Sequence, residues 1–230
     1  MTAITAEGAA FNDVVQARRS IRAFRTDPVP RAVLDSVFSA ALRAPSNCNT
    51  QPWFVYVATG DVLEQLREEL PQRFAQGDIG VDYPYDGKYE GVYRDRQYAS
   101  AKTLYDALGI EREQKTERQA WFLNNFRFFG APCAAFFTLP GEFGLREACD
   151  LGMFAQSVML GLTAHGLGSC PQTALGFMTH VIKPALDIPE EEKLLFGLSL
   201  GYPDEDAPAN RAITERADMD QVVRVSLIHI

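Results

Sequence analysis

The chain has 230 residues, of which 47% are hydrophobic and 23% are charged, so it is long enough to form one sizeable core. Two full domains are not expected, because domains typically run to ~100–200 residues. The formal net charge of −8 excludes a general affinity for nucleic acid or for an anionic membrane, since both repel an acidic surface.

The cysteines and the hydropathy pattern indicate a reducing compartment. The four cysteines are widely spaced and form no CxxC pair, which argues against a disulfide framework or a zinc site. No segment has the ~18 apolar residues that a membrane-spanning helix needs. The first residues also lack the basic and apolar regions of a secretory signal. We therefore expect a cytoplasmic protein with no membrane partner, no nucleic-acid partner and no metal.

Hydrophobic periodicity predicts a mixture of helices and strands. Residues 1–10 are predicted to form a loose arm. Helices are predicted over 11–18, 31–44, 62–73, 94–108, 111–128, 146–165, 174–186 and 219–223. Buried strands are predicted over 54–59, 131–139 and 193–202. A loop is predicted over 76–93, an extended turn over 168–175 and an extended tail over 224–230. The helix over 146–165 is apolar nearly all round, which is typical of a core or an interface.

An arginine cluster follows the first predicted helix. Arg18, Arg19 and Arg22 place three guanidinium groups around the hydroxyl of Ser20. The planar fork of arginine suits bidentate binding of phosphate, and a serine hydroxyl adds a further donor. The alternative is a solvated basic helix end, where cations are also favourable.

An amide-rich loop, APSNCNTQPW, lies between a predicted helix and a predicted strand at residues 44–53. Its side chains both donate and accept hydrogen bonds, which suits the edge of a heteroaromatic ring. Taken alone, such a loop is better explained as an ordinary capped connection.

Four segments in order carry a family resemblance. RRSIRAF at 18–24 and APSNCNTQPW at 44–53 resemble the nitroreductase superfamily of FMN enzymes. The likeness extends through DLGMFAQSVMLGLTAHGLGSCPQ to LGYPDEDAPANRAITER, so it covers nearly the whole chain. It implies an α+β fold with a central, mainly antiparallel sheet flanked by helices, in an intertwined homodimer with FMN at the interface. It also implies one domain over 1–230, with a helical and loop excursion at 76–130 that covers the active site.

The resemblance also assigns cofactor-binding residues. It implies that Arg18, Ser20 and Arg216 hold the FMN phosphate with help from Arg19, while Arg211 is a second-choice phosphate ligand. It implies that Arg22 reaches the ribityl chain and the N1/O2 side of the flavin, where a cation stabilises the reduced ring. The remaining implied contacts are Pro45, Ser46, Asn47 and Asn49 on the ring of the partner subunit's flavin, and Pro171, Gln172 and Thr173 at the N5 edge.

Two positions depart from the family pattern. Asn47 and Cys48 stand where many relatives have small residues, and Gln172 follows Pro171 where some relatives have glutamate. A backbone N–H is the alternative donor to flavin N5.

The excursion is rich in aromatic residues and, with NFRFFGAPCAAFFTL, resembles a subgroup linked to nitroaromatic reduction. Tyr85, Trp121 and Phe126 are candidates for a wall that stacks on a small aromatic substrate. The alternative is that these rings simply pack the excursion.

The function implied is a ping-pong transfer of hydride from NAD(P)H through FMN to a nitroaromatic compound, giving a hydroxylamino or amino product. No side chain is required as an acid or base, because the flavin carries the chemistry. The alternatives are reduction of quinones, enones or free flavin on the same scaffold, and a flavin-binding protein without turnover.

Overall fold

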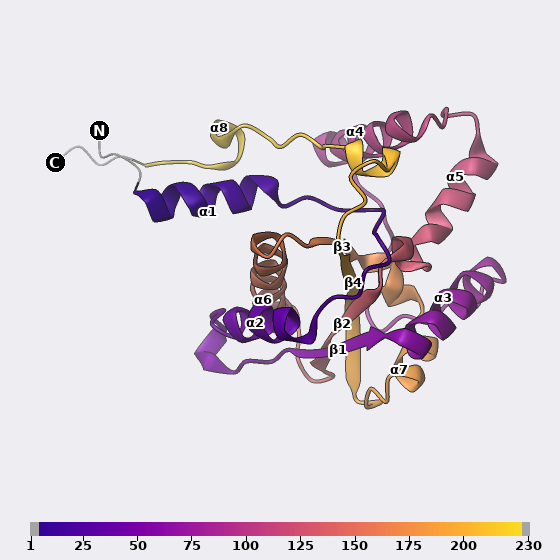
Figure 1. The fold of residues 1–230 in the computed structure, drawn as a ribbon, viewed down its shortest axis with the longest axis horizontal. Coiled ribbons are helices and arrows are strands. Elements are labelled where there is room, and N and C mark those ends of the chain that lie inside the picture. Colours follow the sequence, from indigo (N-terminus) through magenta and orange to yellow (C-terminus); the bar gives the residue numbers. More distant parts are fainter. Residues whose placement is uncertain (1–4, 227–230) are drawn as a thin grey trace.

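A four-stranded antiparallel sheet lies at the centre of the structure, a computed structural model that describes residues 5–226 (Figure 1). The strands are β1 (Phe54–Thr59), β2 (Cys133–Pro140), β3 (Gly168–Gln172) and β4 (Glu192–Gly201), in the order β1-β2-β4-β3. All three pairings are antiparallel. The antiparallel sheet flanked by helices is therefore confirmed, and so are the predicted strands over 54–59, 131–139 and 193–202, to within two residues.

Strand β2 is buried on both faces, which explains its unbroken run of apolar residues. Ala134 and Phe136 face one hydrophobic core, together with Leu66 of α3 (Gly60–Ala75). Cys133, Ala135 and Phe137 face a second core. The alternation follows from the two-residue period of a strand, which sends successive side chains to opposite faces.

Helices cover both faces of the sheet. Helices α2 (Arg31–Ala41) and α6 (Leu145–Ala164) pack on one face, as Figure 1 shows, while α3 and α7 (Thr179–Ala185) pack on the other. In α2 the buried positions Leu34, Val37 and Ala41 recur at helical spacing, so one stripe of the helix faces the core.

The excursion leaves the sheet after α3. It comprises an irregular segment, the helices α4 (Gly91–Leu108) and α5 (Lys115–Phe122), and the short 3₁₀ helices η2 (Leu123–Asn125) and η3 (Phe128–Gly130). Neither α4 nor α5 contains a buried residue in the single chain.

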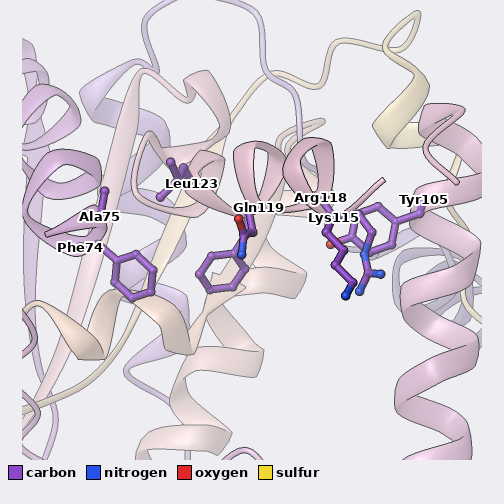
Figure 2. Close-up of a pocket in the computed structure, with 8 residues that line it drawn as sticks. Phe74, Ala75, Tyr105, Lys115, Arg118, Gln119 and Leu123 are labelled. Carbon is purple, nitrogen blue, oxygen red and sulfur yellow. The ribbon is translucent and has the colours of Figure 1, made fainter. Parts of the chain in front are cut away.

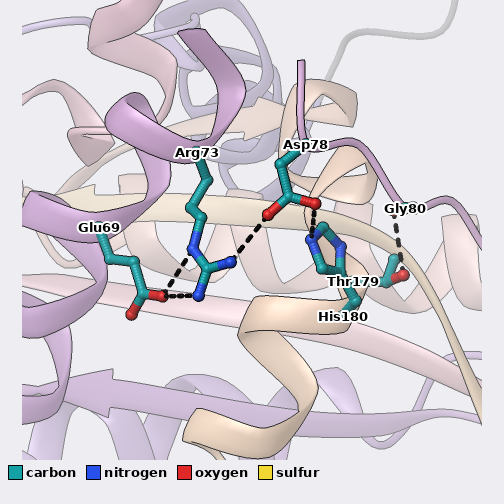
Figure 3. Close-up of polar contacts among 6 residues, drawn as sticks. All are labelled: Glu69, Arg73, Asp78, Gly80, Thr179 and His180. Carbon is teal, nitrogen blue, oxygen red and sulfur yellow. Dashed lines mark hydrogen bonds and ion pairs between the residues drawn. The ribbon is translucent and has the colours of Figure 1, made fainter. Parts of the chain in front are cut away.

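Polar contacts tie the start of the excursion to the helices below it (Figure 3). Asp78 accepts from Arg73 of α3 at 2.9 Å, and its carboxylate lies 3.0 Å from His180 Nε2 of α7. Thr179 donates its hydroxyl to the Gly80 carbonyl at 3.1 Å. A Cβ at Gly80 would lie 2.5 Å from the His180 ring, so this close approach requires glycine.

Two segments project away from the sheet on the same side of the molecule in Figure 1. One is α1 (Ala6–Ala17), and the other is the C-terminal segment that follows η5 (Pro208–Arg211) and contains α8 (Met219–Val222). Neither α1 nor α8 has a buried residue. Each carries a large exposed apolar side chain: Phe11 is 59% exposed and Met219 is 72% exposed.

Several predicted boundaries were wrong. The extended turn at 168–175 contains strand β3, and the helix expected over 174–186 is divided into η4 (Thr173–Phe177) and α7. The first helix begins at Ala6 rather than at residue 11, because Thr5 caps it by accepting from Gly8 N at 3.1 Å. Residues 1–4 of the predicted arm and 227–230 of the predicted tail lie outside the described residues.

The helix predicted over 111–128 ends early, at Phe122. The chain passes there into the 3₁₀ helix η2, and φ angles of 55° and 52° at Phe128 and Phe129, in the left-handed region, rule out a helix at the end of the predicted range. Within residues 5–226, no helix is long and apolar enough to cross a membrane, and no cluster of three His, Cys, Asp or Glu side chains is placed to hold a metal.

Candidate active site

The arginine segment 18–24 lies alongside strand β3. Ser20 forms a parallel bridge with Ser169, and Ile21 N donates to the Ser169 carbonyl at 2.9 Å. A Cβ at Gly168 would lie 2.6 Å from Ile21 Cγ1, so the absence of a side chain at this position permits the contact. The bridge brings Ser20 close to Cys170 in the middle of β3. Burial raises the pKa of the Cys170 thiol to about 11, against the opposing influence of Arg22, Ser20 and Arg18.

Asn210, a residue that sequence reasoning missed, fixes this segment to the C-terminal part of the chain. Its buried side chain accepts from Arg22 N at 2.7 Å and donates to the carbonyls of Ala23 and Asp204, each at 2.8 Å. Its backbone carbonyl accepts from Arg19. The Arg19 guanidinium is thus used in folding, and Asn210 sets the position of Arg22.

Arg18 and Arg216 come together from opposite ends of the chain. Burial and then the nearby positive charge of Arg216 lower the pKa of Arg18. Arg216 is held by the carbonyl and hydroxyl of Thr214, at 3.1 Å and 2.9 Å. Among residues 5–226, no carboxylate forms a salt bridge with either guanidinium. Two cations held near each other without a carboxylate partner can bind a polyvalent anion.

Arg211 forms a hydrogen bond that does not connect it to Arg18 or Arg216. Its guanidinium donates to the Asp206 carbonyl of its own loop at 3.2 Å.

The amide-rich loop is held in a strained conformation. Cys48, Asn49 and Gln51 have φ angles of 50°, 58° and 50°, which cost free energy in residues other than glycine. The Ser46 hydroxyl accepts from Gln51 N at 2.9 Å, which closes the loop on itself. The side chains of Asn47 and Asn49 remain exposed and are therefore available to a ligand.

Two contacts fix this loop to α6. Asp150, whose side chain is buried, accepts from Asn47 N at 3.0 Å. At the end of the loop, Trp53 stacks on Phe154 with ring centroids 4.8 Å apart. In the single chain the loop therefore packs on α6, whereas the arginine segment packs on β3.

The three candidates at the end of β3 do not face the same way. Pro171 and Thr173 are exposed, but the Gln172 side chain is buried. Gln172 accepts from the Ser199 hydroxyl and donates to the Asn125 carbonyl, the latter at 2.7 Å. The carboxamide therefore links β3, β4 and the excursion, and the Gln172 side chain is not free for a ligand.

The three aromatic candidates differ in exposure. Phe126 is fully buried, with its ring 4.4 Å from that of Phe74, so it packs the core and is removed from the substrate-binding set. Tyr85 is exposed, and its ring lies 6.0 Å from that of Phe177. Trp121 is half-buried beside Phe129.

Comparison with known proteins agrees with this arrangement. The model of the nitroreductase family matches residues 15–202. The chain belongs to the nitroreductase family. It is 40% identical to the nitroreductase NfnB of Mycolicibacterium smegmatis over 214 residues, which are 93% of this chain and 91% of the relative. It is 34% identical to a 4-nitrobenzoate reductase of Pseudomonas putida, over 87% of this chain and 88% of that relative.

A solved structure of this nitroreductase family shares the whole fold. The crystal structure of the FMN-dependent nitroreductase NfnB from Mycobacterium smegmatis, in complex with NADPH, superposes with a TM-score of 0.91. The two are 39% identical, and the alignment covers 95% of this chain and 99% of the other. Because the alignment with this structure covers 95% of the chain, most of the excursion belongs to the shared architecture.

Proposed function

We propose that this protein is an FMN-dependent oxidoreductase that uses NAD(P)H to reduce nitroaromatic compounds to hydroxylamino or amino products. The observation that carries the proposal is the Arg18–Arg216 pair, which lacks a carboxylate partner in residues 5–226 and fits a phosphate dianion. The relatives support the cofactor, the reductant and the substrate class, because their names include FMN, NADPH and 4-nitrobenzoate.

Each segment of the site has a distinct task in this proposal. When bound, FMN would supply the hydride chemistry between NAD(P)H and the acceptor. Arg18, Ser20 and Arg216 anchor its phosphate. Arg22, fixed by Asn210, places a positive charge beside the flavin ring, which favours the reduced form. Asn47 and Asn49 offer amide groups to the ring edge, and Thr173, exposed directly after β3, offers a hydroxyl.

A homodimer completes this site in our proposal. The loop with Asn47 packs on α6, apart from the arginine segment of the same chain, and would serve the flavin of the partner subunit. The apolar exposure of Phe11, Met219 and Met153, the last on α6 and 41% exposed, supports a large partner interface. Burial of these side chains against a second copy would stabilise both projecting segments.

The excursion over 76–130 would cover the active site as part of a single domain. Tyr85 and Trp121 retain ring surface, so we propose them as the stacking wall for an aromatic acceptor. We also propose a cytoplasmic location, which four unpaired cysteines support.

The decisive experiment is the absorbance spectrum of the purified protein, followed by steady-state oxidation of NADPH and NADH. Flavin bands at one FMN per chain and turnover with nitroarenes are expected. Protein that binds no flavin would overturn the proposal. Flavin-loaded protein that oxidises NAD(P)H no faster with any acceptor would instead be a flavin-binding protein without turnover. Faster turnover with quinones or enones than with nitroarenes would make those compounds the substrate class.

A further inference from the structure

A second site lies apart from all the proposed flavin ligands, in a pocket between α4, α5 and the end of α3 (Figure 2). The pocket has a volume of about 680 Å³, which is within the range of small-molecule sites. Its lining residues are Phe74, Ala75, Tyr105, Lys115, Arg118, Gln119, Phe122 and Leu123.

The two ends of the pocket differ in chemistry. Phe74 and Ala75 lie at one end in Figure 2, whereas Lys115 and Arg118 lie at the other end beside Tyr105. Gln119 lies between them and brings an amide to the middle of the pocket. A ligand that fits this gradient has an apolar aromatic part and an anionic part.

The guanidinium of Arg118 is held in place but is only partly hydrogen-bonded. Its guanidinium lies 5.2 Å from the centroid of the Tyr105 ring, and one nitrogen donates to the Arg112 carbonyl at 2.8 Å. Its Nε is buried and has no hydrogen-bond partner within residues 5–226. A buried donor without an acceptor costs free energy, so the protein itself satisfies this guanidinium only in part.

Lys115 and Arg118 also line an adjoining cavity, together with Asp106 and Glu111. Neither Arg118 nor Lys115 forms a salt bridge with any carboxylate in the part of the chain that the structure describes. By contrast, Lys102 on α4 is paired with Asp106 one turn further along. Two unpaired cations at one end of a pocket attract an anion more strongly than either cation alone.

We propose that this pocket binds an aromatic monocarboxylate, with the carboxylate on Arg118 and Lys115 and the ring against Phe74 and Phe122. The inference goes beyond the proposed function, since it concerns a cavity that contains none of the residues assigned to flavin. The pocket is nevertheless connected to that site, because Leu123 lines it and Asn125, two residues later, accepts the hydrogen bond from Gln172.

The test is isothermal titration calorimetry of the purified protein with benzoate, in the absence of NAD(P)H and with its flavin content recorded. Benzoate carries no nitro group, so binding is measured without turnover and independently of the proposed activity. Benzamide has the same ring without the charge and is expected to bind at least tenfold more weakly. Arg118→Gln and Lys115→Gln are each expected to weaken benzoate binding about tenfold, a typical loss for one charge-assisted hydrogen bond.

Two further variants separate the two ends of the pocket. Arg118→Lys keeps the charge but loses the planar fork, so it is expected to bind benzoate with intermediate affinity. Phe122→Ala is expected to weaken benzoate and benzamide equally. Arg96→Gln removes an exposed cation of α4 that does not line the pocket, and it serves as the matched control.

Three results would overturn the inference. The first is an Arg118→Gln variant that binds benzoate as tightly as the unmodified protein. The second is equal affinity of the unmodified protein for benzoate and benzamide. The third is an Arg118→Gln variant that loses binding of NADP⁺ but not of benzoate. The last result would assign the cations to a nucleotide phosphate. None of these results bears on whether the protein carries FMN, so the two proposals fail separately.

Discussion

The buried carboxylate of Asp150 accepts a hydrogen bond from the backbone N–H of Asn47 at 3.0 Å and so holds the amide-rich loop on α6. Three residues of that loop have positive φ angles, so the loop keeps its shape only while such contacts outweigh the strain. We expect Asp150→Leu to weaken FMN binding roughly tenfold or more, since hydrogen bonds to charged groups contribute about 1.5–3 kcal/mol.

The measurement is a titration of the flavin-free apoprotein with FMN, with the quenching of flavin fluorescence as the signal. Asp150→Asn retains an acceptor for Asn47 N and is expected to lose much less affinity than Asp150→Leu. Glu142→Gln removes an exposed carboxylate elsewhere and controls for charge. Equal affinity in Asp150→Leu and the unmodified protein would show that the loop holds its shape without this contact.

Removal of either member of the Arg18–Arg216 pair should reduce flavin retention. Arg18→Ala and Arg216→Ala are each expected to bind FMN about ten to a hundred times more weakly, because each loses a charge-assisted hydrogen bond to phosphate. Turnover should fall in proportion to the flavin lost. Arg25→Ala is the control, since Arg25 is exposed and paired with Asp27 at 2.8 Å.

The absorbance ratio of flavin to protein after gel filtration measures this retention. If Arg18→Ala purified with full flavin content and full activity, the phosphate assignment would be wrong.

Two buried thiols make the protein sensitive to alkali. Burial raises the pKa of Cys170 to about 11 and that of Cys133 to about 12, from an ordinary value of 9.0. Above pH 9 the unfolded chain loses these protons while the folded chain retains them, so the free energy of unfolding falls as the pH rises. The melting temperature should therefore be level from pH 7 to 8.5 and should fall from pH 9 to 12.

Thermal melts across this pH range test the expectation, with one variant of a buried cysteine and one variant of an exposed cysteine. Cys133→Ala should melt at a lower temperature at neutral pH, because it leaves a small cavity, but with a shallower decline in alkali. Cys149→Ala changes an exposed thiol and should follow the unmodified protein. An equally steep decline in Cys133→Ala would assign the alkaline loss to other groups.

The Gln172 carboxamide should matter more for stability than for flavin contact. Gln172→Leu leaves the buried Ser199 hydroxyl and the Asn125 carbonyl without their partner, at a cost of about 1–3 kcal/mol for each unsatisfied group. Each kcal/mol lowers the melting temperature of a chain of this size by ~2–4 °C.

Calorimetry gives the melting temperature, and hydrogen exchange over residues 121–126 reports whether η2 loosens. Ser199→Ala removes only one of the two contacts and should lie between Gln172→Leu and the unmodified protein. If Gln172→Leu were as stable as the unmodified protein but lost flavin, the Gln172 side chain would be assigned to cofactor binding instead.

Local sequence pattern predicted the elements that depend on local signals. Strand β1 matches its predicted bounds, since FVYVAT is β-branched, aromatic and bounded by breakers. Strand β3 was missed because GSCPQ has neither alternation nor a run of apolar residues, and it is a strand only through its pairing with β4. Phe126 could not be separated from the exposed aromatic residues, because spacing does not say which rings of a long excursion meet the core.

The partners that set the candidate site are distant in sequence. Asp150 and Asn47 are 103 residues apart, and Asn210 and Arg22 are 188 residues apart. An isolated Asp in an apolar helix or an Asn beside an arginine carries no local signal of such contacts. The family resemblance found segments that contain these residues, but only three-dimensional packing shows which of their atoms fix the backbone.

Arg18 directly follows α1 and Arg216 lies in the C-terminal segment before α8, and this placement has a thermodynamic consequence. An anion held between them would connect two segments whose exposed apolar side chains would be buried in the proposed homodimer. Flavin affinity and subunit affinity are then linked, and by reciprocity each strengthens the other by the same factor. Dilution of the protein would release flavin, and removal of flavin would raise the concentration at which the subunits separate.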